Sequence, residues 1–413
     1  MTARIRFVAV CAAALMAGMV SARAQDADSE VERGRYLAVA GNCTSCHTAP
    51  GGAAMAGGVA FVTDFGTIYS TNITSDAAAG IGGWSYEQFA RAMREGIAAD
   101  GRHLYPAFPY PSFARITDDD MKALYAYFKT VPAASTKPPE NKMSFPFNQR
   151  GLMAVWNALF FDGAAFAPDP AQSSEWNRGA YLVQGLAHCG ACHTPRNFLG
   201  AEDNARALSG GTLNDRVARN KVRPWTAVNL TSAQSGLAAW TEQDVFDYLK
   251  TGHSNRGGSA GPMNEVVGNS TRHLTDTDVK AMAVYLKSLP PIEPSPQHEL
   301  SAEERRRGET LYTIHCGTCH LPTGLGAKPG SELGPPLVGS AIAQAADPAT
   351  LINAILYGRE ILPGSQSPEH WTNMKPLGNV LNDADVAAIA TYVRGDWGNR
   401  GGPVTAEQVA KQR

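Results

Sequence analysis

Three short stretches of the sequence place two cysteines three positions apart, with a histidine directly after the second cysteine. Each thiol of such a pair can form a thioether with a vinyl group of a porphyrin, and the imidazole beside it then becomes an axial iron ligand. This spacing is the attachment signature of c-type haem, so the sequence predicts three haem c groups. The predicted attachment residues are Cys43, Cys46, Cys189, Cys192, Cys316 and Cys319, and the predicted proximal ligands are His47, His193 and His320.

Other uses of paired cysteines explain less of the sequence. Structural zinc takes two cysteine pairs or one pair with added histidines, and a redox Cys-x-x-Cys lies in a thioredoxin-like pattern. Neither accounts for a histidine after every pair in three repeats. The chain has seven cysteines, and the unpaired one, Cys11, lies in the N-terminal apolar stretch. No disulfide is therefore expected in the mature protein.

Each haem used for electron transfer commonly carries a methionine opposite the histidine, where the thioether raises the reduction potential. Met263 follows Gly-Pro a short way before Thr275, and Met374 lies next to Lys-Pro shortly before Asn382. Both occupy the loop before the last helix of their repeat. The alternative role is filling a core, for which methionine is well suited. We expect Met263 and Met374 to be the sixth ligands of the second and third haems.

The first repeat departs from this pattern, because Phe108 stands where the methionine is expected. Phenylalanine cannot coordinate iron, so the first haem is either five-coordinate or held by another side chain. His103 is the best placed candidate for its sixth ligand. Met55 follows His47 so closely that it is not expected to reach the opposite face. The remaining candidates are Met93, Met121 and Met143.

A common frame of helices surrounds the three motifs and must position them. A helical stretch containing Arg-Gly precedes each first cysteine, and a later helix begins at a Thr or Asn cap followed by acidic residues, which suit the helix dipole. Glycine inside a helix costs about 1 kcal/mol relative to alanine, so its recurrence predicts a close contact there. We expect that contact to be a tyrosine at the same offset in each last helix. The pairs are Gly34 with Tyr127, Gly179 with Tyr285, and Gly308 with Tyr392.

The repeats predict a mainly α fold of three tandem class I-type cytochrome c domains joined by proline-rich linkers. A chain of 413 residues exceeds what one hydrophobic core usually serves. The predicted boundaries are 28–133 for the first domain, 173–290 for the second and 301–398 for the third, with linkers at 134–172 and 291–300 and a polar tail at 399–413. The first linker contains an apolar segment, 151–161, that is too short to span a bilayer. We expect it to pack between domains or against a partner subunit, with contact to a membrane surface as the alternative.

Residues 1–24 are typical of a secretory signal peptide, with a positive start, an apolar run over 7–20 and the cleavage site Ala22-Arg23-Ala24. The run is shorter than the roughly 20 apolar residues of a membrane span, which argues against an anchor. Export agrees with covalent haem attachment, which takes place outside the cytoplasm, so a periplasmic protein is expected. The net charge of −2 gives no reason to expect nucleic acid as a partner.

With these motifs in view, the chain resembles the three-haem cytochrome c subunits of membrane-associated dehydrogenases. Relatives of this kind serve quinone-dependent alcohol dehydrogenase and flavin-dependent gluconate, fructose, sorbitol and glucose dehydrogenases. The specific motifs are 65–74, 145–150 and 261–267, and the resemblance covers nearly all of the mature chain. Such relatives have methionine where Phe108 stands. The resemblance implies that electrons leave a catalytic subunit and pass through the haems to ubiquinone or another carrier, at the outer face of the cytoplasmic membrane.

Two functions of different classes follow. The sequence contains no nucleophile motif, dinucleotide-binding glycine loop or catalytic metal cluster, which favours a non-catalytic electron-transfer subunit. Its partner would be a dehydrogenase subunit with a flavin, pyrroloquinoline quinone or molybdenum cofactor. The alternative is a haem enzyme or ligand sensor that uses an open coordination site on the first haem. Phe108 is the residue that supports the alternative, and an optical spectrum with carbon monoxide separates the two.

Overall fold

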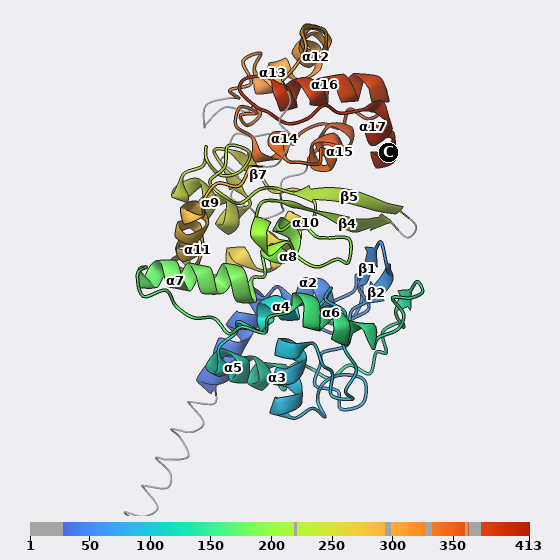
Figure 1. Cartoon of the computed structure of the whole chain (residues 1–413), viewed down its shortest axis with the longest axis vertical. Coiled ribbons are helices and arrows are strands. Elements are labelled where there is room, and N and C mark those ends of the chain that lie inside the picture. The colour runs from blue at the N-terminus through green and yellow to red at the C-terminus, as the bar shows by residue number, and fades with distance from the viewer. Residues whose placement is uncertain (1–27, 219–220, 294–298, 327–332, 360–361, 363–372) are drawn as a thin grey trace, which may run out of the picture.

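The computed structural model describes residues 28–218, 221–293, 299–326, 333–359, 362 and 373–413. Helices predominate, and three regions follow one another along the longest axis in chain order (Figure 1). We refer to 28–172, 173–300 and 301–413 as the first, second and third regions, each with one haem-attachment motif. The predicted signal peptide lies outside the described residues. No helix among the described residues is long and apolar enough to cross a membrane.

The first region begins with a helix over 28–40, which leads directly into its haem motif. A small antiparallel sheet pairs Ala60 with Tyr69 and Gly66 with Met143, so the predicted linker supplies one strand. The elements are α2 (Cys43–His47), β1 (Ala60–Thr63), β2 (Gly66–Tyr69), α3 (Tyr86–Glu95), α4 (Tyr110–Phe113), α5 (Asp118–Phe128), β3 (Lys142–Met143) and α6 (Leu152–Phe160).

The second region repeats this order with a longer hairpin. β4 and β5 pair antiparallel, with Gly211 opposite Ala227, and they reach toward the third region (Figure 1). The elements are α7 (Ser174–Tyr181), a π-helical turn (Leu182–Leu186), α8 (Gly190–His193), a 3-10 turn (Asn204–Arg206), β4 (Gly211–Ala218), β5 (Lys221–Ala227), α9 (Glu242–Thr251), β6 (His253–Ser254), β7 (Gly257–Gly258), α10 (Pro262–Asn269), a second 3-10 turn (Thr271–His273) and α11 (Asp276–Ser288).

The third region has no named strand among its described residues. Its elements are α12 (Ala302–His315), α13 (Gly317–His320), α14 (Ala341–Gln344), α15 (Ala349–Tyr357), α16 (Asp383–Gly395) and α17 (Ala406–Gln412). The structure differs here from the expected polar tail over 399–413. Thr405 caps α17, Val409 is fully buried, and the Tyr357 hydroxyl donates to the Gln412 carbonyl at 2.6 Å. The buried Val409 and the hydrogen bond to the Gln412 carbonyl dock this helix on the third region.

The predicted contact between glycine and tyrosine is present in all three regions. A Cβ added to Gly34 would lie 1.9 Å from the Ala123 carbonyl oxygen and 2.7 Å from the Tyr127 Cβ. Any side chain there would force the first and last helices apart, which explains why glycine recurs despite its low helix propensity. The corresponding distances to the tyrosine Cβ are 2.8 Å for Gly179 and Tyr285 and 2.3 Å for Gly308 and Tyr392.

The first and second regions share one hydrophobic core, whereas the third has its own. Leu37 and Met121 from the first region belong to the same buried cluster as Leu182 and Met282 from the second. The cluster around Ile352 and the other buried residues of the third region is separate. The first two predicted domains are therefore packed into one body, and the boundary between them is a shared interior rather than a simple linker.

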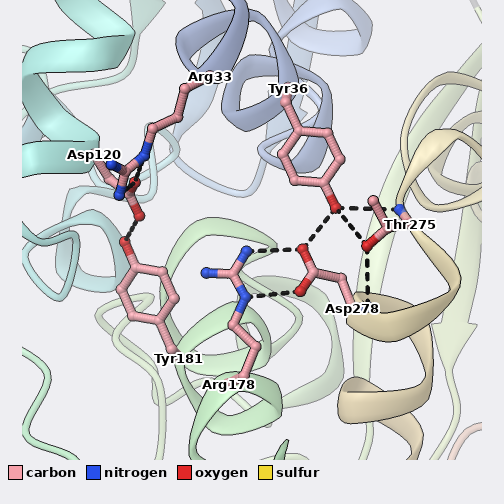
Figure 2. A network of polar contacts seen from close by, with 7 residues as sticks. All are labelled: Arg33, Tyr36, Asp120, Arg178, Tyr181, Thr275 and Asp278. Carbon is pink, nitrogen blue, oxygen red and sulfur yellow. Dashed lines mark hydrogen bonds and ion pairs between the residues drawn. The ribbon is translucent and has the colours of Figure 1, made fainter. Parts of the chain in front are cut away.

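A reciprocal set of polar contacts joins the first two regions (Figure 2). Arg33 donates to Asp120 at 2.8 Å within the first region, and the Tyr181 hydroxyl of the second region donates to the other carboxylate oxygen at 2.6 Å. The same arrangement runs in the opposite direction. Arg178 donates to Asp278 at 2.7 Å, and the Tyr36 hydroxyl of the first region donates to that carboxylate at 2.6 Å. Each region thus inserts one tyrosine into the ion pair of the other, as in a two-fold interface between identical partners.

The electrostatics of this interface favour a charged Asp278 and neutral phenols. Burial favours the protonated acid at Asp278, yet hydrogen bonds from Arg178 and Tyr36 hold its pKa below the usual range. Burial and the hydrogen bond to Asp120 raise the pKa of Tyr181 to about 12, so its hydroxyl remains a donor. Both effects match charge-assisted hydrogen bonds, which are stronger than neutral ones.

The apolar segment of the first linker forms α6, which packs against both of the first two regions. Met153 and Trp156 are buried, and the Trp156 indole donates to the Leu199 carbonyl at 3.0 Å. The opposite side of the helix carries Leu152, Val155 and Leu159, which are 42%, 56% and 66% exposed. The expected packing between domains is present on one face only, and the other face is apolar and open.

Candidate haem-binding sites

In all three motif histidines, Nδ1 bonds to a backbone carbonyl and Nε2 is left available to bind a metal. Nδ1 of His47 lies 2.7 Å from the Thr71 carbonyl oxygen. A carbonyl oxygen can only accept, so Nδ1 carries the proton and Nε2 keeps the lone pair that a metal requires. The same bond joins His193 to Val228 at 2.7 Å and His320 to Pro335 at 2.8 Å. Hydrogen bonds of this kind fix the ring orientation of metal-ligating histidines.

Burial lowers the pKa of all three imidazoles, which favours the neutral form that coordinates iron. None of the six motif cysteines forms a disulfide in the described structure. Within the same residues, no group of three or more His, Cys, Asp or Glu side chains is placed to share a metal ion. Free thiol pairs beside imidazoles with an available Nε2 are the donor set that covalent haem requires.

The carbonyl that orients the histidine is held by a short Asn-x-Thr motif in the first two regions. Asn72 follows Thr71; its amide donates to the Ala134 carbonyl at 2.7 Å, and its Oδ1 accepts from the Thr74 amide at 2.9 Å. Asn229 makes equivalent bonds in the second region. The sequence showed that this motif repeats but not what it does, because the role depends on a histidine far away in the chain. In the third region Pro335, whose φ the ring fixes, supplies the carbonyl.

Backbone hydrogen bonds place Phe108 and Met263 at equivalent positions. The amides of Leu104 and Ser259 each donate at 2.7 Å to the carbonyl of the glycine that caps the preceding helix, α3 or α9. Phe108 and Met263 are each the fourth residue after these anchors. Phe108 therefore occupies the place of the second region's methionine, as the sequence pattern indicates.

The space around Phe108 is aromatic. Its ring packs against Phe113 with centroids 5.4 Å apart, and Phe113 in turn meets the His188 ring at 5.6 Å. His103 lies earlier in the same segment, bridged to Ile97, and its buried Nδ1 has no hydrogen-bond partner among the described residues.

The methionines considered for the first haem lie in varied surroundings. Met121 is fully buried in α5, and Met93 and Met55 are each 8% exposed within the shared core. Met143 lies in β3 opposite Gly66. These placements leave the sixth ligand of the first haem open.

The two predicted methionine ligands are half-buried and lie in different local structures. Met263 is the second residue of α10, so it lies in a helix and not in the loop that the sequence predicts. The helix is preceded by Gly261, where a positive φ of 53 and the Trp225 ring, 2.7 Å from an added Cβ, both require glycine. Trp225 Nε1 is buried and has no hydrogen-bond partner in the part of the chain that the structure describes. Met374 instead exchanges backbone hydrogen bonds with Arg359 at 3.0 and 3.1 Å. The third site therefore places its methionine directly beside an arginine.

Comparison with known proteins agrees with this geometry. Residues 31–132 match the cytochrome c family model, and residues 303–393 match that of subunit III of cbb3-type cytochrome c oxidase. The chain is 40% identical to the gluconate 2-dehydrogenase cytochrome c subunit of Pantoea cypripedii, over 94% of this chain and 90% of that relative. It is 38% identical to the fructose dehydrogenase cytochrome subunit of Gluconobacter japonicus, over 93% and 82%. The chain belongs to the family of dehydrogenase cytochrome c subunits.

A third relative of this cytochrome c subunit is much longer. It is a nicotinate dehydrogenase subunit of Pseudomonas putida, 43% identical over 88% of this chain, which spans 30% of that relative. The family's cytochrome c domains carry covalently bound haem c and serve electron transfer. The resemblance drawn from the motifs is therefore confirmed.

Proposed function

We propose that this cytochrome c subunit carries three haem c groups in three tandem cytochrome c domains, over 28–133, 173–290 and 301–398, and passes electrons between them. The three matching hydrogen bonds from histidine Nδ1 to a backbone carbonyl carry the proposal, because they leave the same nitrogen available at each motif. Haem iron supplies the one-electron redox chemistry, and the chain supplies ligands, burial and spacing. The proposed attachment residues are Cys43, Cys46, Cys189, Cys192, Cys316 and Cys319, with His47, His193 and His320 as proximal ligands.

A haem count tests this proposal directly. The pyridine haemochrome spectrum of the purified protein should give three haem c groups per chain. Replacing Cys316 and Cys319 together by alanine should remove one third of the haem, and the same change in either other motif should do likewise. A count of two in the unaltered protein, with no loss from one of the double replacements, would contradict the third site.

Met263 and Met374 are proposed as sixth ligands of the second and third haems. Met263, near the start of α10, and Met374 both lie before the capped last helix of their region, α11 or α16, where an electron-transfer haem receives its methionine. Replacing either methionine by alanine should lower the potential of one haem and leave the others unchanged, because the thioether stabilises the reduced iron. Potentiometric titration measures the three potentials.

The proposed electron donor is a catalytic dehydrogenase subunit with a flavin, pyrroloquinoline quinone or molybdenum cofactor, in the periplasm at the outer face of the cytoplasmic membrane. Ubiquinone or a soluble carrier would accept the electrons. The relatives support a donor of this kind, because they are named as subunits of dehydrogenases. The long relative named as a nicotinate dehydrogenase subunit also carries a cytochrome part as a minority of its length.

We place the docking site for that catalytic subunit on the open face of α6. A helix that is apolar on all sides is normally buried, yet Leu152, Val155 and Leu159 are exposed. No charged residue occurs between Arg150 and Asp162, whereas helices that lie on membranes usually carry a lysine- and arginine-rich face. The chemistry therefore favours the apolar core of a protein interface.

This docking site is tested by purifying the tagged chain from its host and assaying the bound flavin, quinone or molybdenum subunit. The double variant Val155→Glu/Leu159→Glu should lose that subunit. Leu325→Glu changes a residue that is 62% exposed in the third region and should retain it. Retention by both variants would exclude α6 as the docking site.

A second function, ligand chemistry at the first haem, is favoured by Phe108 alone. If no side chain fills the sixth position, carbon monoxide should bind one of three ferrous haems without any change of protein. If His103 or a methionine holds that position, the spectrum should not change. In the open case, Phe108→Met should abolish carbon monoxide binding and raise one reduction potential.

A further inference from the structure

An arginine with a buried nitrogen that has no partner among the described residues lies at the junction of the second and third regions. Arg359 follows the cap of α15, and its Nη2 atom is buried. In the described part of the chain no group accepts a hydrogen bond from Nη2. A guanidinium does not lose its proton in proteins, so burying it costs free energy until an anion is supplied. Burial also lowers the pKa of Arg359, the direction expected for a cation removed from water.

A second unpaired donor faces Arg359 from the second region. His253, in β6, is 5% exposed, and neither of its ring nitrogens has a partner among the described residues. Burial, followed by the charge of Arg359, lowers the pKa of His253 to about 4. The ring is therefore neutral near pH 7 and carries one N–H that must donate to something. Arg359 and His253 together require an acceptor with negative charge.

The junction is held by contacts that keep both donors in place. Arg256, in the hairpin that carries His253, donates to the Val338 carbonyl at 3.1 Å. The Thr226 amide donates to Thr350 Oγ1 at 2.8 Å, and the Asn353 amide group donates to the Pro224 carbonyl at 2.9 Å. These bonds cross between the regions and hold the hairpin that carries His253, β5 and α15 in place relative to one another.

The chemistry of the missing acceptor follows from where Arg359 lies. Its backbone exchanges two hydrogen bonds with Met374. Arg359 thus lies directly beside one proposed axial ligand of the third haem. Haem brings two propionate carboxylates, and a guanidinium matches a carboxylate with two parallel hydrogen bonds.

We propose that Arg359 and His253 bind a propionate of the haem attached at Cys316 and Cys319, so that a residue of the second region completes the third haem site. The proposal rests on the proposed function, because it requires that haem to be present. Arg359 then also raises the reduction potential of the third haem, since a nearby positive charge favours the less positive, reduced iron.

The test is a potentiometric titration of the full-length, haem-loaded protein, with haem content measured by pyridine haemochrome. Arg359→Gln should lower one of three potentials, changing the ratio of reduced to oxidised haem at a fixed voltage by about tenfold, the scale of one buried unit charge. Arg359→Lys keeps the charge and should shift that ratio less. Arg306→Gln removes an exposed arginine of the same region and should shift nothing, because solvent screens its charge.

A double-mutant cycle identifies the shared ligand. His253→Phe keeps the ring but removes both nitrogens, and it should lower the same potential by a smaller factor. If both residues bind one carboxylate, the effects of Arg359→Gln and His253→Phe should not add.

Two failures are distinguishable. An unaltered protein with three haems whose potentials do not respond to Arg359→Gln overturns this inference and leaves the electron-transfer function standing. An unaltered protein that lacks the third haem overturns the function itself. If Arg359→Gln loses the third haem while Arg359→Lys and Arg306→Gln keep it, the role of the charge in holding that haem is supported.

Discussion

The junction between the first and second regions differs from the junction between the second and third. The first pair shares one hydrophobic core and exchanges two tyrosines, Tyr36 and Tyr181, between two partly buried ion pairs. The third region keeps the corresponding ion pair, Arg307 with Asp385, at 3.7 Å, but it has Thr310 at the tyrosine position. A threonine cannot reach into a neighbour, so the third region cannot pair through this face.

The contacts of the third region with the second are made instead by β5 and the following loops. Thr226 and Thr350 bond each other twice through backbone and hydroxyl groups, and Arg223 stacks on the Tyr357 ring at 3.6 Å from its centroid. One module sequence thus supports two kinds of junction, depending on a single position of the first helix. The comparison predicts that the first junction governs stability, whereas the second governs the environment of one haem.

The largest effect is expected from Asp278→Ala. This change leaves Arg178 and Tyr36 without their shared partner at a half-buried site. Removing one member of a fully buried ion pair typically costs about 3–5 kcal/mol, and the 35% exposure of the Arg178 side chain places the expected loss at the lower end of this range. Denaturant unfolding followed by circular dichroism should show that loss in the transition of the first two regions. A loss below about 1 kcal/mol would mean that the reciprocal contacts do not hold these regions together.

Tyr181→Phe is expected to cost about 1.5–3 kcal/mol, the usual range for a hydrogen bond to a charged group. Tyr36→Phe should cost a similar amount, because the two contacts mirror each other. Unfolding of both single variants and of the double variant measures this. Strongly unequal costs would contradict the two-fold relation.

The acid sensitivity of the junction follows from Asp278, whose pKa is lowered in the folded protein. A lowered carboxyl pKa contributes stability above the unfolded value, about 3.9, and that stability is lost as pH falls through the folded pKa. The unaltered protein should therefore lose stability more steeply below about pH 4 than Asp278→Asn. If the free energy of unfolding changes with pH equally in the two proteins between pH 5 and pH 2, Asp278 does not cause the acid sensitivity.

The smallest effect is expected from Asp385→Ala in the third region. Its partner Arg307 is 58% exposed and the pair is 3.7 Å apart, and exposed ion pairs contribute about 0–1 kcal/mol. Unfolding of the third region should change little. A loss as large as that of Asp278→Ala would show that this ion pair stabilises a region as strongly without an inserted tyrosine as with one.

The sequence was sufficient for the parts of the fold that depend on local spacing. The haem motifs, the capped last helices and the glycine that faces Tyr127, Tyr285 or Tyr392 are all readable because each region repeats them. Repetition reveals a shared constraint even when the contacting residue is far away. The axial ligands drawn from those motifs stay proposals until haem-loaded protein is measured.

Contacts between regions were not predictable in the same way. Tyr36 and Tyr181 lie in ordinary amphipathic helices, and nothing in their own surroundings indicates that each serves the other's ion pair. Arg359 likewise has no repeated counterpart, since Ile97 and His253 occupy the matching hairpin positions. Such roles depend on how whole regions pack, which no single repeat encodes.

The π-helical turn Leu182–Leu186 shows how the frame accommodates a change of length. The first cysteine of the haem motif lies nine residues after the glycine that faces the tyrosine in the first region, ten residues after it in the second and eight in the third. A π turn absorbs one additional residue without ending the helix. Insertions and deletions here are tolerated as long as glycine and thiols keep their places in space. What the module keeps constant is the distance in space between the glycine and the first cysteine, and the number of residues between them varies.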